Sequence, residues 1–129
     1  MQISQQLMFT GHAEQAMALY VSLLPGSRIV SVERYGAGER GAEGSVRQAM
    51  FELCGVRYRC IDSPVKHAFT FTPSISLCIE FDSRDQWDAA YAELSVDGQI
   101  LMPAGSYDFS RHFAWLQDRF GVSWQLLLP

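Results

Sequence analysis

The sequence GVRYR at residues 55–59 has a counterpart, GVSWQ, at residues 121–125. Both pentapeptides begin with Gly-Val and then carry an aromatic residue at the fourth position and a polar residue at the fifth. An alternating segment directly after a glycine is typical of the second strand of a β-hairpin. The two stretches therefore predict that each half of the chain closes with a similar hairpin.

A second correspondence lies upstream of these hairpins. Phe9 precedes Tyr20 by eleven residues in the first half, and Phe81 precedes Tyr91 by ten in the second. Self-similarity at a fixed spacing indicates an internal repeat, here a duplicated module of roughly 60 residues. The predicted bounds are about 1–63 for module 1, 64–73 for a linker and 74–129 for module 2.

Apolar residues at helical or alternating spacing predict the same element order, βαβββ, in both modules, which is an α+β class. The expected elements of module 1 are a strand over 3–9, a helix between Gly11 and Pro25, and strands over 28–35, 45–53 and 56–62. Those of module 2 are a strand over 74–81, a helix that begins at Ser83 with a capping box completed by Gln86, and strands near 99–103, 113–117 and 122–128, with a loop around Gly105.

Composition and charge exclude several classes of function. The chain has 129 residues, of which 48% are hydrophobic, and its formal net charge of -4 is opposite in sign to the basic surface of a nucleic-acid-binding protein. The first residues lack the features of a signal peptide, and no window is apolar enough to span a membrane. Three cysteines without a Cys-x-x-Cys pair indicate neither a disulfide framework nor a zinc site. We therefore expect a cytoplasmic protein with no nucleic-acid or membrane partner.

The glycines Gly36, Gly38 and Gly41 have the spacing of a dinucleotide-binding motif. That motif opens a helix, whose N-terminus binds the pyrophosphate. Here the alternating segment 45–53 follows, and it predicts a strand. The triplet is therefore interpreted as a flexible hairpin loop.

A tandem βαβββ repeat in so short a chain, with Ala16 and Tyr20 spaced Ala-x-x-x-Tyr, resembles the vicinal-oxygen-chelate superfamily of glyoxalases, bleomycin-resistance proteins and extradiol dioxygenases. The stretches similar to its PhnB-like branch, often labelled 3-demethylubiquinone-9 3-methyltransferase, are 11–29, 43–46, 69–77 and 117–128. The resemblance implies a single domain of curved mixed sheets around a cleft, and a homodimer. Methyl transfer itself is unexpected, because a methyl donor such as S-adenosylmethionine usually needs a glycine-rich strand-to-helix turn in a parallel sheet.

The resemblance also implies where a catalytic metal would bind, with one ligand on the first and last strand of each module. Carried over by the internal repeat, these positions lie near Ser4 to Gln6, at Arg59, near Ser76 and at Gln125. None of them is a histidine or a carboxylate, the usual ligands of such metals. We therefore expect no catalytic metal and no cofactor.

The leading hypothesis is a small-molecule-binding protein with an anionic ligand. Arg59 would attract the anionic group, Ser76 and Gln125 would form hydrogen bonds with it, and aromatic side chains would pack against the remainder. Strand alternation favours Gln6 over Gln5 on the ligand side of the first strand. The candidate ligand-binding residues are Gln6, Arg59, Phe71, Ser76, Trp115 and Gln125.

Two alternatives stay open, as does the question whether any reaction is catalysed. One is a metal-dependent enzyme of the glyoxalase or thiol-transferase type, with ligands recruited from residues such as Asp62, Glu80 or His112. The other is a drug-sequestering resistance protein, which needs an acidic cleft for a cationic drug and is disfavoured by Arg59.

The remaining reactive side chains receive structural interpretations. Loop or cap positions are expected for His12, His67 and His112. Core packing is expected for Cys54, Cys60 and Cys78. A favourable interaction with the dipole of the second helix is expected for Glu80, Asp82, Asp85 and Asp88.

Overall fold

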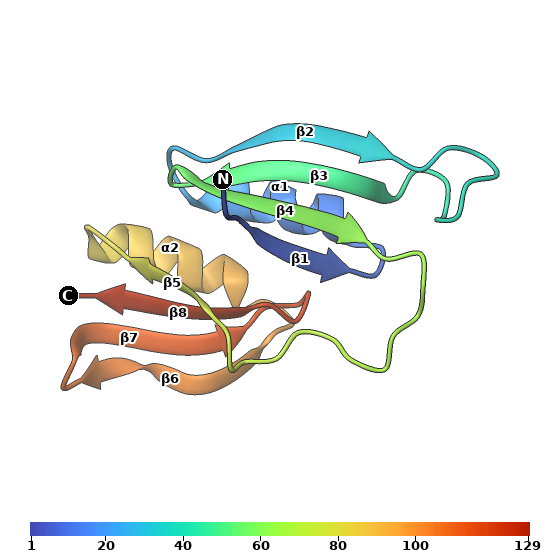
Figure 1. Ribbon diagram of the computed structural model, residues 1–129. Helices are drawn as coiled ribbons and strands as arrows, with labels where there is room; N and C mark the ends of the chain where they lie inside the picture. The colour runs from blue at the N-terminus through green and yellow to red at the C-terminus, as the bar shows by residue number, and fades with distance from the viewer. The chain divides into compact units, whose positions relative to one another are not determined.

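The computed structural model describes residues 1–129, which divide into two units, Met1–Ala68 and Phe69–Pro129. The boundary falls inside the segment where the sequence places a linker. Each unit contains one helix and one four-stranded sheet, in the order strand, helix and three strands. The α+β class and the duplicated βαβββ order are therefore confirmed (Figure 1). Neither helix has the length and apolar character that crossing a membrane requires.

The first unit closes its sheet by pairing the first and last strands of the module. Its elements are β1 (Gln5–Phe9), α1 (Ala13–Leu23), β2 (Arg28–Arg34), β3 (Val46–Leu53) and β4 (Val56–Asp62). The strand order is β1-β4-β3-β2, with β1 parallel to β4 and β3 antiparallel to β2 and β4. Strands that lie far apart in the sequence thus become neighbours.

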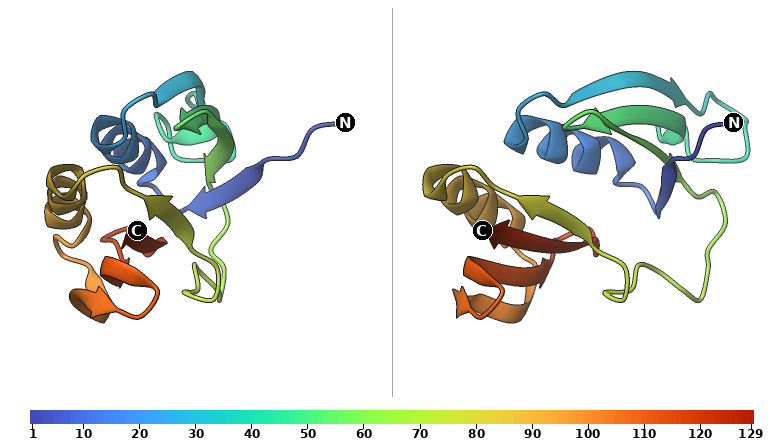
Figure 2. Two further views of the ribbon diagram at one scale, coloured as in Figure 1. Left: turned by 90° about the vertical axis from the view of Figure 1, so that its left-hand side faces the viewer. Right: turned by 60° about the vertical axis from the view of Figure 1, so that its left-hand side comes forward.

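Helix α1 covers one face of this sheet (Figure 2). Its apolar residues recur at helical spacing, so that one side of the helix is buried. The buried helix residues are Ala13, Ala16, Met17 and Tyr20. The alternate buried residues that face them from β3 and β4 include Ala49, Phe51, Tyr58 and Cys60. The residues between these alternate positions form the opposite, helix-free face of the sheet.

The second unit repeats this arrangement. Its elements are β5 (Leu77–Glu80), α2 (Arg84–Leu94), β6 (Gln99–Tyr107), β7 (Ser110–Gln117) and β8 (Ser123–Leu128). The strand order is β5-β8-β7-β6, with β5 parallel to β8 and β7 antiparallel to β6 and β8. Helix α2 buries Trp87, whose Nε1–H donates to the Leu126 carbonyl oxygen at 3.1 Å. The face of this sheet opposite α2 is again helix-free.

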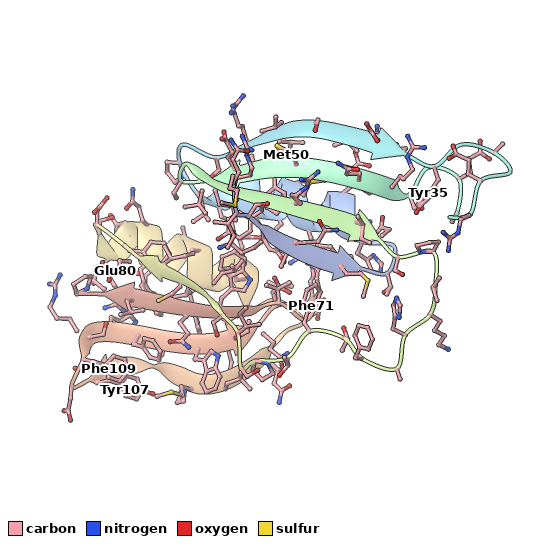
Figure 3. The ribbon with its side chains drawn as sticks, viewed as in Figure 1. Tyr35, Met50, Phe71, Glu80, Tyr107 and Phe109 are labelled. Carbon is pink, nitrogen blue, oxygen red and sulfur yellow. The ribbon has the colours of Figure 1, made fainter.

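The β6–β7 hairpin differs from the prediction. β6 continues through Gly105 to Tyr107 and β7 starts at Ser110, so the loop expected around Gly105 is wrong. Irregularities in the register allow the hairpin to continue through this region. Tyr107 and Phe109, side by side in Figure 3, pack against the ring of Phe113 with centroid distances of 5.6 and 4.8 Å. This aromatic packing stabilises the end of the hairpin.

The glycine triplet lies in the connection between the antiparallel strands β2 and β3, which confirms a hairpin and not a helix start. The N–H of Tyr35 donates to the Ser45 carbonyl oxygen at 2.9 Å, and the N–H of Gly44 donates to that of Tyr35 at 2.8 Å. Gly41 lies against the Tyr35 ring, and a Cβ added there would be 2.3 Å from ring atoms. The connection is therefore closely packed at this glycine.

The two helices are capped in different ways. For α2 the Ser83 Oγ accepts a hydrogen bond from the Gln86 backbone N–H at 3.2 Å, as the sequence predicts. His12 occupies the N-cap of α1, but its side chain makes no capping hydrogen bond. The cap comes instead from Asp62 at the end of β4, whose Oδ1 accepts from the Ala13 N–H at 3.0 Å.

Asp62 connects three segments of the first unit. Its Oδ1 also accepts from the Gly11 N–H at 2.8 Å, and its Oδ2 accepts from the Val46 N–H at 2.9 Å. Both carboxylate oxygens of Asp62 therefore accept hydrogen bonds from the backbone, and the residue is only 4% exposed. Because hydrogen bonds to an ionised group are stronger than neutral ones, this carboxylate holds the starts of α1 and β3 to the end of β4.

We predict that Asp62→Asn lowers the free energy of unfolding by about 2 kcal/mol, because an amide NH2 replaces one acceptor oxygen and meets a backbone donor. Urea unfolding followed by circular dichroism measures the change. Glu43→Gln is the matched control, since it removes one negative charge from an exposed position in the same unit, and it should change the value by less than about 0.5 kcal/mol. Equal stability of Asp62→Asn and the native protein would contradict the role of Asp62.

Candidate functional site

The helix-free face of the first unit carries a row of residues across all four strands. The register pairs Gln6 with Arg59, Arg59 with Met50, and Met50 with Ser31. Residues paired in this way point to the same face of a sheet. Gln6 thus lies beside Arg59, on the face opposite Phe9. Figure 3 labels Met50 on β3.

Arg59 is the row's charged residue, and it forms no ion pair in the structure. The neighbouring charges on this face are already engaged: Arg57 donates to Gln2 Oε1 at 2.7 Å, and Glu52 accepts from Arg28 at 2.7 Å. Arg59 lies on β4, an inner strand of the sheet, and it is half-buried. An arginine without a carboxylate partner favours the binding of an anion.

The second unit has the equivalent row on its own helix-free face. The register pairs Cys78 with Gln125, Gln125 with Trp115, and Trp115 with Met102. Two predicted residues, Gln125 and Trp115, are thus direct neighbours. The row combines a thiol, an amide, an indole and a thioether, and it carries no charge of its own.

A chain of hydrogen bonds connects this row to two serines. Trp115 Nε1–H donates to Ser123 Oγ at 2.9 Å, and Ser123 Oγ lies 2.7 Å from Ser76 Oγ. Gln125 Nε2 donates to Ser76 Oγ at 3.4 Å. Ser76, Trp115 and Gln125, which the sequence proposed as ligand contacts, therefore form one polar cluster in this unit.

Phe71 lies outside the cluster. It precedes β5, is half-buried, and has a ring atom 3.5 Å from where a Cβ on Gly121 would be (Figure 3). Phe71 therefore packs beside the turn between β7 and β8. The structure places Gln6 and Arg59 together in the first unit and groups Ser76, Trp115 and Gln125 in the second.

Two residues of the second unit, Cys78 and Ser123, were not predicted as members of the site. Cys78 precedes Phe81 by three residues, as Gln6 precedes Phe9, so the repeat itself contained the signal that Cys78 is the counterpart of Gln6. The sequence placed the first-strand position of module 2 near Ser76. In the structure β5 begins only at Leu77, and the residue paired with Gln125 is Cys78. Nothing in the sequence indicated the contacts of Ser123 with Trp115 and Ser76.

The cysteines differ from the expectation. Cys60 is buried, as predicted, but Cys54 and Cys78 are exposed, so a core assignment is wrong for both. Burial, with a smaller effect of Asp62, raises the pKa of the Cys60 thiol to about 12. Partial burial and the charge of Glu80 raise the pKa of Cys78. The thiol of Cys78 therefore stays protonated at neutral pH, which disfavours a nucleophilic role.

The alternative metal ligands are Asp62 in the first unit and Glu80 and His112 in the second. Asp62 already accepts three backbone hydrogen bonds, and it faces α1. Glu80 lies on the helix-free face of its sheet, whereas His112 lies on the opposite face within β7, 4.1 Å from the Trp87 ring centroid. A loop position for His112 is therefore wrong. The pKa of His112 is lowered, because burial and the charge of Arg84 outweigh the opposite effect of Asp88.

The other two histidines and the acidic residues near α2 have local roles. His12 Nδ1 lies 3.2 Å from Gln15 Oε1, and His67 Nε2 lies 3.1 Å from Ser63 Oγ. Asp85 is in the first turn of α2, where it interacts favourably with the helix dipole. Asp88 instead forms an ion pair with Arg84, at 2.8 Å.

The strand positions that the resemblance assigns to a metal do not fit one. The register identifies them as Gln6, Arg59, Cys78 and Gln125. A guanidinium is permanently charged and has no lone pair to donate. In the first unit the amide of Gln6 supplies no negative charge to offset it, and in the second unit the amide of Gln125 and the protonated thiol of Cys78 supply none either. Neither pair of side chains therefore offers the ligands that a divalent cation usually requires.

A separate hollow of about 280 Å³ lies at the β6–β7 turn, lined by residues 106–111 and Pro129. It contains none of the six candidate residues. Its lining includes Phe109, which is 58% exposed, and Arg111, which donates to the Pro129 carbonyl oxygen. The hollow is therefore not part of the site that the sequence proposes.

Comparisons with known proteins identify the family of this chain. The family model described as 3-demethylubiquinone-9 3-methyltransferase matches residues 1–127. The PhnB protein from Bacillus cereus is 49% identical, with all of both chains covered and a TM-score of 0.97. No curated protein matches the sequence.

More distant structures share the fold alone. A protein from Pseudomonas aeruginosa is 22% identical, with 99% of this chain and 97% of that chain covered and a TM-score of 0.85. The fosfomycin resistance protein FosX from Listeria monocytogenes, solved with Mn(II) and 1S,2S-dihydroxypropylphosphonic acid, is 8% identical, with coverage of 99% and 92% and a TM-score of 0.64. The chain thus belongs to the family described as 3-demethylubiquinone-9 3-methyltransferase.

Proposed function

We propose that the protein binds a small anionic molecule and that Arg59 is its principal contact with the anionic group. The observation that carries this proposal is that Arg59, a half-buried residue on an inner strand, forms no ion pair. Its positive charge is therefore available to a partner of opposite charge. A carboxylate, phosphate or phosphonate matches the planar donor array of arginine.

The row around Arg59 supports a ligand that is polar at one end only. Gln6 on one side offers an amide that donates and accepts hydrogen bonds, whereas Met50 on the other side is an adaptable apolar neighbour. Small-molecule sites combine few polar groups with apolar walls in this way. We assign Gln6 the role of orienting the anionic group.

The second unit contributes hydrogen-bonding and aromatic side chains to the proposed binding function. Ser76 and Gln125 are half-buried residues of the polar cluster, and Trp115 lies beside Gln125. Phe71 adds a second aromatic side chain in this unit. We propose these four residues as ligand contacts by their chemistry, since polar anchors beside aromatic rings are the usual lining of such sites.

The alternatives receive less support. The FosX structure, which shares the fold, contains Mn(II) and a small phosphonic acid, and a phosphonate belongs to the ligand class that we propose for Arg59. A metal-dependent reaction fits poorly, because Arg59 occupies one of the four expected ligand positions. Sequestration of a cationic drug fits poorly for the same reason, since an unpaired arginine repels a cation.

We predict that Arg59→Ala weakens the binding of small anions roughly tenfold or more, because a charge-assisted hydrogen bond is lost. Isothermal titration with inorganic phosphate, acetate and benzoate measures the affinity, and Arg59→Lys should retain part of it. Arg40→Ala, which removes an exposed arginine from the β2–β3 connection of the same unit, is the matched control. Unchanged affinity in Arg59→Ala, or an equal loss in Arg40→Ala, would exclude this role.

A second prediction concerns metal content. Plasma mass spectrometry of the purified protein, before and after incubation with zinc, nickel and manganese, should find far less than one metal ion per chain. The reason is that neither Gln6 with Arg59 in the first unit nor Cys78 with Gln125 in the second offers an imidazole or a carboxylate. Near-stoichiometric metal that persists after dialysis would overturn the argument and favour the metal-dependent enzyme.

We also propose a cytoplasmic homodimer. The free cysteines agree with a reducing compartment, and each sheet ends in unpaired edge strands, which proteins commonly cover by association. Size-exclusion chromatography with light scattering should give about twice the 14.5 kDa of one chain. A mass equal to that of one chain would contradict the dimer.

A further inference from the structure

We propose that Ser76 acts as a hydrogen-bond donor toward the ligand, and that Ser123 and Trp115 are positioning residues that fix the direction of its hydroxyl proton. The ligand atom that faces Ser76 is then an acceptor oxygen. This inference rests on the proposed binding function, and it specifies the chemistry that the second unit recognises. It follows from the number of protons and lone pairs in the polar cluster.

The first step is the indole of Trp115. Its Nε1–H can only donate, and it points at Ser123 Oγ at 2.9 Å. Ser123 therefore accepts this hydrogen bond. Because its N–H is used within the protein, Trp115 presents only its aromatic surface to a ligand.

The second step is the hydroxyl proton of Ser123. Ser123 is 2% exposed, so a hydroxyl proton without an acceptor would be costly there. The side-chain oxygen within reach is Ser76 Oγ, at 2.7 Å. Ser123 must therefore donate to Ser76, because the reverse direction would leave the buried proton unpaired.

The third step is the oxygen of Ser76. It accepts from Ser123 and also from Gln125 Nε2 at 3.4 Å, so both of its lone pairs are engaged. The hydroxyl proton of Ser76 is the one that no group of the cluster accepts. Ser76 is half-buried and lies immediately before β5, where this proton is available to a ligand.

The arrangement selects the ligand by its chemistry. A carboxylate, phosphate or carbonyl oxygen accepts the Ser76 proton, whereas an ammonium group would place a second donor against it. The two hydrogen bonds that Ser76 accepts polarise its hydroxyl, so that it donates more strongly. Gln125 Oε1 remains as the acceptor of the cluster. The second unit therefore favours an oxygen acceptor beside an apolar or aromatic group that lies on the indole.

Nuclear magnetic resonance of serine-labelled protein at low temperature tests the proton direction without a ligand. We expect the hydroxyl proton of Ser123 to exchange slowly with water and to show a nuclear Overhauser effect to the β-hydrogens of Ser76. The hydroxyl proton of Ser76 should exchange rapidly. A slowly exchanging Ser76 proton, held by Ser123 or by Gln125, would overturn the inference.

Titration with benzoate and benzylamine tests the consequence for binding. Benzoate should bind more tightly than benzylamine, Ser76→Ala should weaken benzoate binding roughly tenfold, and Ser76→Thr, which keeps the hydroxyl, should restore it. Ser123→Ala should reduce the preference for benzoate, because the Ser76 proton is then free to rotate. Ser106→Ala, at an exposed position of β6, is the control and should change nothing.

The two proposals fail in different ways. If Arg59→Ala weakens benzoate binding and Ser76→Ala does not, the inference about Ser76 is wrong and the proposed function stands. If Ser76→Ala weakens binding and Arg59→Ala does not, the anion contact assigned to Arg59 is wrong. If benzoate does not bind to the native protein, the role of Ser76 toward a ligand is overturned together with the proposed function.

Discussion

Parallel pairing of the first and last strands of each module is the constraint on which the rest of the structure depends. β1 lies beside β4, and β5 lies beside β8, although a helix and two strands separate the members of each pair in the sequence. This pairing makes the last strand an inner strand, and it places residues of distant segments in one row, Gln6 with Arg59 and Cys78 with Gln125. In the first unit the buried carboxylate of Asp62 secures the arrangement, because it binds the backbone where α1 and β3 begin. The candidate functional residues are thus positioned by the same contacts that close the sheets.

The local patterns of the sequence were sufficient for most of the fold. Alternation and helical spacing depend on neighbouring residues only, and the serine cap of α2 is equally local, so these features were predictable. The cap of α1 was not, because Asp62 lies about fifty residues away and no short pattern connects it with Ala13. The β6–β7 hairpin was predicted too short for a similar reason. Gly105 indicates a loop when read alone, whereas the packing of Phe109 on Phe113 maintains the hairpin and appears only in three dimensions.

The residues of the candidate site also differ in how far local sequence patterns could indicate them. Strand alternation favoured Gln6 over Gln5 and the internal repeat proposed Gln125, because both depend on periodicity. Ser123 is different, since its importance comes from two hydrogen bonds between side chains of different segments. A serine in an alternating strand carries no sign of such contacts. The repeat also conceals a chemical difference: corresponding positions hold an arginine in the first unit and a glutamine in the second, so duplication kept the geometry and changed the charge.

The account depends most on the claim that Arg59 receives an anion. The most direct measurement is a titration with inorganic phosphate in which the side-chain Nε–Hε resonance of Arg59 is followed by nuclear magnetic resonance. We expect a large, saturable shift of this resonance, with smaller shifts for the side-chain amide of Gln6 and none for Arg40. A resonance of Arg59 that stays unchanged while other arginines shift would contradict the account.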